Sequence, residues 1–156
     1  MDEPTFDLET AHRWFAARMN NQAWELLESE ARTSQQDELM RSTAYAAARH
    51  WSEVGQSINH QRAECLLAHV HAALGEASAA VHHARRALEL MTEAGDSIEA
   101  FDRVFTHDAA ARAYLLAEQP PLAASHRAQV QSARSSITDA SDLEVVEAWL
   151  GRDDSA

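Results

Sequence analysis

The sequence predicts an all-α protein, and three observations support this fold class. Hydrophobic residues make up 46% of the 156 residues, which is enough for a buried core. Only four glycines and three prolines interrupt the chain, whereas sandwiches and barrels need many such turn residues. Apolar and small side chains recur at spacings of three and four, which is the period of a helix that buries one face. A chain of this length fits one domain, so we expect residues 1–156 to form a single unit.

The first two predicted helices form a hairpin over residues 6–55. The first helix begins at an N-cap that is either Thr5 or Asp7. After a break, Ser34 with Asp37 offers a shortened capping box for the second helix. That helix ends at a glycine, which favours helix termination.

The second predicted hairpin covers residues 57–95. Ser57 or Asn59 caps its first helix, which Gly75 closes in the position that favours a left-handed backbone. Its second helix runs from about Ser78 and ends at another glycine. Small residues line that helix at helical spacing, which is typical of two closely packed antiparallel helices.

The third predicted hairpin covers residues 96–138, and a short helix over 141–150 follows it. Asp96 and Glu99 have capping-box spacing, and two consecutive prolines start the second helix of this hairpin. The breaks recur about every 40 residues, so the chain reads as three antiparallel hairpins with that period. The last helix is expected to act as a capping helix over the open end of the array. A compact seven-helix bundle is the alternative.

Part of the second hairpin resembles a tetratricopeptide (TPR) repeat. The match consists of the Leu74-Gly75 pair, Ala87 and Ala94, whereas His71 stands where the family has a large apolar residue. The stretch from residue 50 to 102 also looks like a small bacterial TPR-like family of unassigned function. The resemblance implies a TPR-like right-handed superhelix that binds a protein or peptide, and it implies no active site.

Charge and composition restrict the partners that we expect. The formal net charge is −12 and all 13 basic residues are arginine, so phosphate backbones and anionic membranes are unfavourable partners. No run approaches the roughly 18 apolar residues of a membrane span. The single cysteine, Cys65, is expected to be a packing residue, and we expect a cytoplasmic protein without nucleic-acid or membrane partners.

Two predicted stripes point to a groove, and one of them, on the first helix of the second hairpin, consists of Arg62, Cys65, His69 and Ala72. Phe101, Phe105, Asp108 and Arg112 share one face of a helix, and by extension of the TPR-like resemblance that face is concave. Such a mixture suits a peptide or a small anionic ligand that arginine would read. The alternative is an ion pair between the last two residues beside two core phenylalanines. The candidate groove residues are Arg62, His69, His83, Phe101, Asp102, Phe105, His107, Asp108 and Arg112.

The nine histidines raise the question of a metal site, but their spacing argues against one. No two of them lie three or four residues apart, as two ligands on one helix face would. His83 is expected to pack against neighbouring helices and to need an acidic partner, with Asp102, Asp108 or Glu64 as candidates. We therefore expect no metal, no cofactor and no catalytic residue.

The sequence favours an interaction module over an enzyme, although it leaves enzymatic activity open. The first hypothesis is a TPR-like protein or peptide binding module. The alternative is a small-molecule or metal-binding pocket, conceivably catalytic, that a His/Asp/Arg cluster would form on the concave face. The first hypothesis includes self-association through exposed Trp14, Trp24 or Trp51. A third hypothesis is a homodimer in which hydrophobic ends or tryptophan patches form an interface that uses the groove itself.

Overall fold

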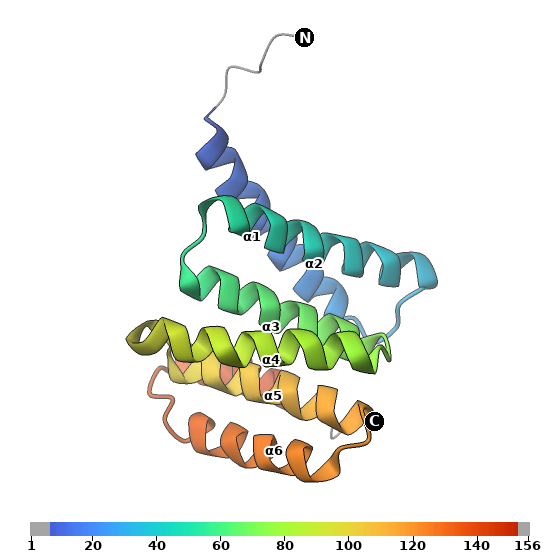
Figure 1. Ribbon diagram of the computed structural model, residues 1–156, viewed down its shortest axis with the longest axis vertical. Helices are drawn as coiled ribbons and strands as arrows, with labels where there is room; N and C mark the ends of the chain where they lie inside the picture. The colour runs from blue at the N-terminus through green and yellow to red at the C-terminus, as the bar shows by residue number, and fades with distance from the viewer. Residues whose placement is uncertain (1–6, 153–156) are drawn as a thin grey trace.

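The computed structural model describes residues 7–152, and this part of the chain is all-helical (Figure 1). It contains no strand within that range. The predicted all-α fold class is therefore confirmed. Its helices are α1 Leu8–Leu27, α2 Ser34–Val54, α3 Ser57–Ala73, α4 Ala77–Ala94, the short 3-10 helix η1 Gly95–Ser97, α5 Ala100–Leu116, α6 Pro120–Arg134 and α7 Ala140–Leu150.

Consecutive helices pack most extensively in the pairs α1/α2, α3/α4 and α5/α6. These pairs follow one another down the long axis of the molecule (Figure 1). Small residues on the facing sides allow the close approach, since Ala44, Ala84 and Ala109 are fully buried. Larger side chains such as Met40 and Leu66 fill the spaces between pairs, so one contiguous core extends through the helices.

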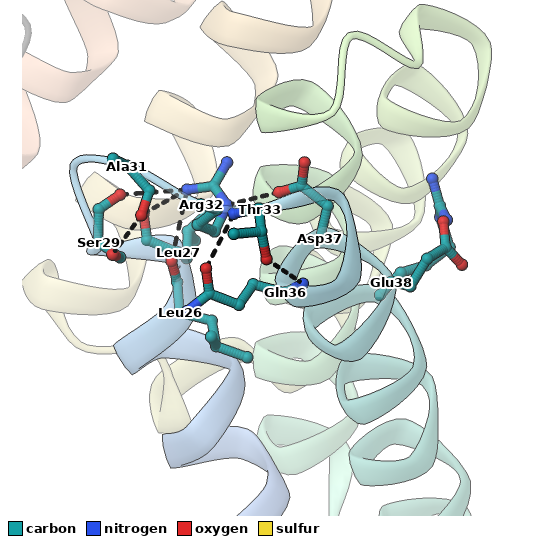
Figure 2. Close-up of polar contacts among 10 residues, drawn as sticks. Leu26, Leu27, Ser29, Ala31, Arg32, Thr33, Gln36, Asp37 and Glu38 are labelled. Carbon is teal, nitrogen blue, oxygen red and sulfur yellow. Dashed lines mark hydrogen bonds and ion pairs between the residues drawn. The ribbon is translucent and has the colours of Figure 1, made fainter.

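Arg32 organises the turn between α1 and α2. Its Nη1 atom lies 3.3–3.5 Å from the carbonyl oxygens of Leu26, Leu27 and Ser29, at the end of α1, where carbonyl groups lack the partners that a continuing helix would supply. Its Nε atom donates to Asp37 at 2.7 Å, at the start of α2. Figure 2 shows the guanidinium between these two helix ends. One cation therefore ties the end of one helix to the beginning of the next.

The N-caps differ from several predictions by one to three residues. Asp7 is the N-cap of α1, as one of the two predictions had it, and Thr5 lies outside the described residues. The capping box of α2 uses Thr33 with Gln36 in place of Ser34 with Asp37. The predicted box in front of α5 is likewise displaced, because η1 occupies that stretch.

The remaining helix starts follow the same pattern. The boxes of α3 and α5 pair Gln56 with Asn59 and Glu99 with Asp102. The sequence pattern also offered Ser141 with Glu144 as the cap of the last helix, but Asp139 caps α7 by accepting hydrogen bonds from two backbone N–H groups. In each case a polar residue within three positions of the predicted one takes the N-cap position.

Helix α7 passes behind α5 in Figure 1 and contacts it. We expected α7 to cover the open end of the array. Instead, its buried Trp149 packs against the three odd-numbered helices α1, α3 and α5. Trp149 contacts the rings of Trp24 on α1, His69 on α3 and Phe105 on α5. It lies against the face that α1, α3 and α5 share. None of the helices within residues 7–152 combines the length and the apolar character that a bilayer crossing requires.

Candidate functional site

The face shared by α1, α3 and α5, here named the α1–α3–α5 groove, holds the indole of Trp149. The ring centroid of Trp149 lies 5.3 Å from that of Trp24, 5.1 Å from His69 and 5.8 Å from Phe105. The first two contacts are edge-to-face, which is a favoured arrangement of aromatic rings. Only 7% of Trp149 is exposed, so the aromatic seat encloses nearly the whole side chain.

Polar contacts complete the seat. The indole N–H of Trp149 donates to Asp108 Oδ2 at 2.8 Å, and Arg112 Nε donates to the same oxygen at 2.7 Å. The guanidinium carbons of Arg112 and Arg152 lie 5.3 and 5.8 Å from the indole centroid. Cations at such distances from an aromatic ring are attracted by its electron-rich face. The seat therefore contacts both the ring and the N–H group of Trp149.

The predicted residues His69 and Phe105 form the floor of this seat. His69 is 2% exposed, and its Nε2 atom lies 3.0 Å from the carbonyl oxygen of Phe105. This contact ties α3 to α5 and fixes the imidazole beside the indole. Phe101 lies one turn earlier on α5 and packs against Phe105 in a tilted arrangement, with ring centroids 4.8 Å apart. The stripe predicted on α5 does share one face.

Arg62 and Asp102, two other predicted residues, form a bidentate ion pair across α3 and α5. The Nε and Nη2 atoms of Arg62 donate to the two carboxylate oxygens at 2.7 and 3.1 Å. The hydrogen bond that Arg62 donates to Asp102 raises the pKa of Arg62 above its usual value. Since Arg112 is likewise engaged with Asp108, neither guanidinium is held ready for the anionic ligand that the sequence suggested. The predicted Asp108–Arg112 ion pair is confirmed.

Two hollows flank the seated tryptophan along the groove. One, of about 620 Å³, lies between the N-terminal halves of α3, α5 and α7 and the C-terminal end of α1. Its lining includes five carboxylates, from Glu25, Glu28, Glu99, Asp102 and Asp142, against the single arginine Arg62. The other, of about 1110 Å³, lies at the opposite end of α7. The smaller hollow is therefore an acidic surface beside an aromatic seat.

Two candidate residues lie away from the groove. His83 contacts Glu64, one of its three predicted partners, with Nδ1 and Oε2 2.6 Å apart. His107 pairs with His126 on α6 through their Nδ1 atoms at 3.0 Å. The pocket hypothesis requires these histidines, acids and arginines to form one cluster. In the structure they form several separate pairs. Within residues 7–152, no three histidine, cysteine or acidic side chains are placed to hold a metal ion together.

Sequence reasoning did not assign Trp149 and Trp24 to the groove. Helical spacing predicts Trp149 on the last helix, over residues 141–150, and the sequence suggests Trp24 only as a residue for self-association. Their meeting depends on how α7 folds back over a distance of more than 100 residues, which no helical period encodes. Trp14 does lie exposed, as self-association through it requires, with 57% of its surface accessible.

Comparisons with known proteins give no relative from which a role could be transferred. No family model matches the chain, and no curated protein or solved structure matches it significantly.

Proposed function

We propose that this protein is a TPR-like polypeptide-binding module, and that its binding face is the α1–α3–α5 groove. The observation that carries the proposal is the seat of Trp149. In this seat a helix already lies on the groove, with its tryptophan enclosed by rings from three helices and its N–H bonded to Asp108. Amphipathic helices that insert such an anchor are a recurrent mode of peptide recognition.

The arrangement of helices supports the TPR-like interpretation. The three helix pairs follow one another along the chain, and the odd-numbered helix of each pair contributes a ring or a hydrogen bond to the same face. In helical-hairpin arrays, one helix of each pair lines the concave surface that binds the partner. A right-handed superhelix of three hairpins is the form that we propose for this chain.

The charge of the groove indicates the chemistry of the partner. The five carboxylates around the smaller hollow face one arginine, and Asp102 already neutralises that arginine. A basic segment is therefore favoured over an anionic one, because opposite charges across an interface are mutually stabilising. We propose a helical partner segment with a tryptophan anchor flanked by arginine or lysine.

A peptide-binding experiment tests this function. The probe is a fluorescent amphipathic helix of about 15 residues with one tryptophan and three lysines, measured by anisotropy. Trp149→Ala vacates the seat, so this variant should bind the probe more tightly than the wild-type protein does. The probe with tryptophan replaced by alanine should lose that gain.

Matched controls make the result specific. Trp14→Ala removes an exposed tryptophan from α1 without touching the groove, and it should bind as the wild type does. Glu25→Gln/Glu28→Gln in the Trp149→Ala background should weaken binding of the lysine probe. Equal binding of the two probes by Trp149→Ala, with helicity retained in circular dichroism, would contradict the proposed anchor site.

A further inference from the structure

A second cluster of polar side chains lies where α2, α3 and α4 meet, and the groove does not include it. Its centre is the hydroxyl of Tyr45 on α2. The Nε2 atom of His71, at the end of α3, lies 2.8 Å from this oxygen, and the Nε2 atom of His83, on α4, lies 3.1 Å from it. The two imidazole rings are nearly parallel, with centroids 5.3 Å apart. Three helices therefore aim one oxygen and two nitrogen ligand atoms at a single place.

Each imidazole is oriented by a carboxylate at its other nitrogen. His83 Nδ1 lies 2.6 Å from Glu64 Oε2, and His71 Nδ1 contacts Glu76. Arg41 in turn forms an ion pair with Glu76. Histidines that bind metals almost always donate their second ring N–H to a carboxylate, a carbonyl or water, which fixes the tautomer. Both rings already have that outer support.

Counting hydrogens shows that the centre lacks one donor when both rings are neutral. A carboxylate only accepts, so the Nδ1 atom of each histidine carries a hydrogen. In two neutral rings both Nε2 atoms then present lone pairs to Tyr45, whose single hydroxyl hydrogen satisfies only one of them. The remaining lone pair can be filled by a proton or by a metal cation at this point.

The surroundings favour a cation and give it access. His71 and His83 are 4% and 9% exposed, so their rings are held in place, whereas Tyr45 is 43% exposed and opens the centre to solvent. Burial, followed by the negative charges of Glu64 and Glu76, raises the pKa of Tyr45. The same negative field attracts a positive ion. Imidazole nitrogens are good ligands for Zn²⁺ and Cu²⁺.

Two other histidine pairs in the chain provide a contrast. His12 and His50 approach through their Nδ1 atoms at 2.8 Å, and His107 and His126 do so at 3.0 Å. In each of these pairs one neutral ring can donate and the other accept, so no donor is missing. The described contacts of these four rings also include no carboxylate at a ring nitrogen. Among the histidine pairs within residues 7–152, the pair of His71 and His83 therefore combines an unsatisfied centre with carboxylates at both outer nitrogens.

We propose that Tyr45, His71 and His83 form a binding site for one divalent transition-metal ion, with Zn²⁺ as the reference ligand. The two Nε2 atoms and the phenol oxygen would be the protein ligands, and water would occupy the solvent side. Glu64 and Glu76 would hold the imidazoles from behind. The spacing argument against a metal considered only pairs on one helix, whereas these two histidines come from different helices of one hairpin.

Isothermal titration of the full chain, stripped with a chelator, with ZnCl₂ tests the proposal. We expect one high-affinity equivalent. His71→Gln and His83→Gln should each weaken this binding by at least about tenfold, and Glu64→Gln by about ten- to a hundredfold, as is usual for residues that support metal ligands. The double variants His12→Gln/His50→Gln and His107→Gln/His126→Gln are matched controls that should retain it.

A spectroscopic measurement keeps the test valid if a histidine variant fails to fold. Zn²⁺ bound to Tyr45 should produce a phenolate difference absorbance in the ultraviolet. Tyr45→Phe, which removes one hydroxyl from a partly exposed side chain, should abolish this signal, while Tyr114→Phe should keep it. The proposal is overturned if no stoichiometric binding occurs, or if Glu64→Gln and Tyr45→Phe bind Zn²⁺ as the wild type does, which would indicate an adventitious ion only.

Discussion

Gly75 and Glu118 adopt the same left-handed backbone conformation at the ends of α3 and α5. Their φ angles are 74° and 56°. In both turns the next residue donates its N–H to a carbonyl five positions back, from Glu76 to His71 and from Gln119 to Tyr114, each at 2.9 Å. Both helices thus end in the same hydrogen-bonded motif, although only one of them has the glycine that suits it.

This equivalence predicts opposite effects of two substitutions. Glu118→Gly should raise the free energy of unfolding by about 0.5–1 kcal/mol, because it removes the steric cost of a left-handed non-glycine residue. Gly75→Ala should lower it by about 1 kcal/mol. No atom lies within 4 Å of the added Cβ at Gly75, so this cost is confined to the backbone. Urea denaturation measures both changes.

A control separates backbone strain from the loss of the glutamate side chain. Glu118→Ala removes the carboxylate but keeps a Cβ, so it should give little of the gain. Equal stabilisation by alanine and glycine at this position would show that the side chain, and not the backbone, is the source.

The hydrogen bond from Trp149 to Asp108 predicts a graded loss of stability. Trp149→Phe keeps most of the aromatic contact but leaves Asp108 without the indole N–H, which should cost about 1–2 kcal/mol. Trp149→Ala empties the seat and should cost about 3–5 kcal/mol. Chemical denaturation followed by circular dichroism measures the series. Equal stability of Trp149→Phe and Trp149→Ala would mean that the ring contacts in the seat contribute nothing beyond the hydrogen bond.

Local and distant features differ in how far the sequence predicts them. The seven helices follow from periodicity, because each must bury one face. Their exact starts were less predictable, since adjacent residues such as Thr33 and Ser34 are both good caps. Which of two neighbouring residues becomes the cap depends on how the connecting turn packs. Between α1 and α2, for example, Arg32 binds Asp37 at the start of the second helix.

The candidate site was predicted only in part for a related reason. The stripe with Phe105 and Asp108 follows from helical spacing, and both residues do face the groove. Trp149 reaches Asp108 across 41 residues, and His107 reaches His126 across 19. Such meetings depend on tertiary packing, and a single sequence contains no period that reveals them.

Cys65 should be chemically inert in the folded protein. It is 4% exposed, and burial raises the pKa of its thiol far above the usual value. Because the thiolate is the reactive form, Ellman's reagent should label Cys65 only after unfolding in denaturant. The labelling rate in native buffer should therefore follow the rate of opening. Stoichiometric labelling within seconds under native conditions would contradict the burial of this side chain.

The contact between His107 and His126 predicts a specific loss of stability in acid. Burial, followed by repulsion from His126 and Arg103, lowers the pKa of His107 from 6.5 to about 4, and burial also lowers that of His126. Between these values the unfolded chain binds more protons than the folded one, so stability present above pH 6.5 is lost as the pH falls toward about 4. His107→Gln removes one of the two titrating rings, and urea denaturation from pH 7 to pH 5 should show a shallower decline for this variant than for the wild type. The carboxylates of the two proteins are identical, so their contribution cancels in the comparison, and parallel stability curves would place the imidazole of His107 in solvent in the folded state.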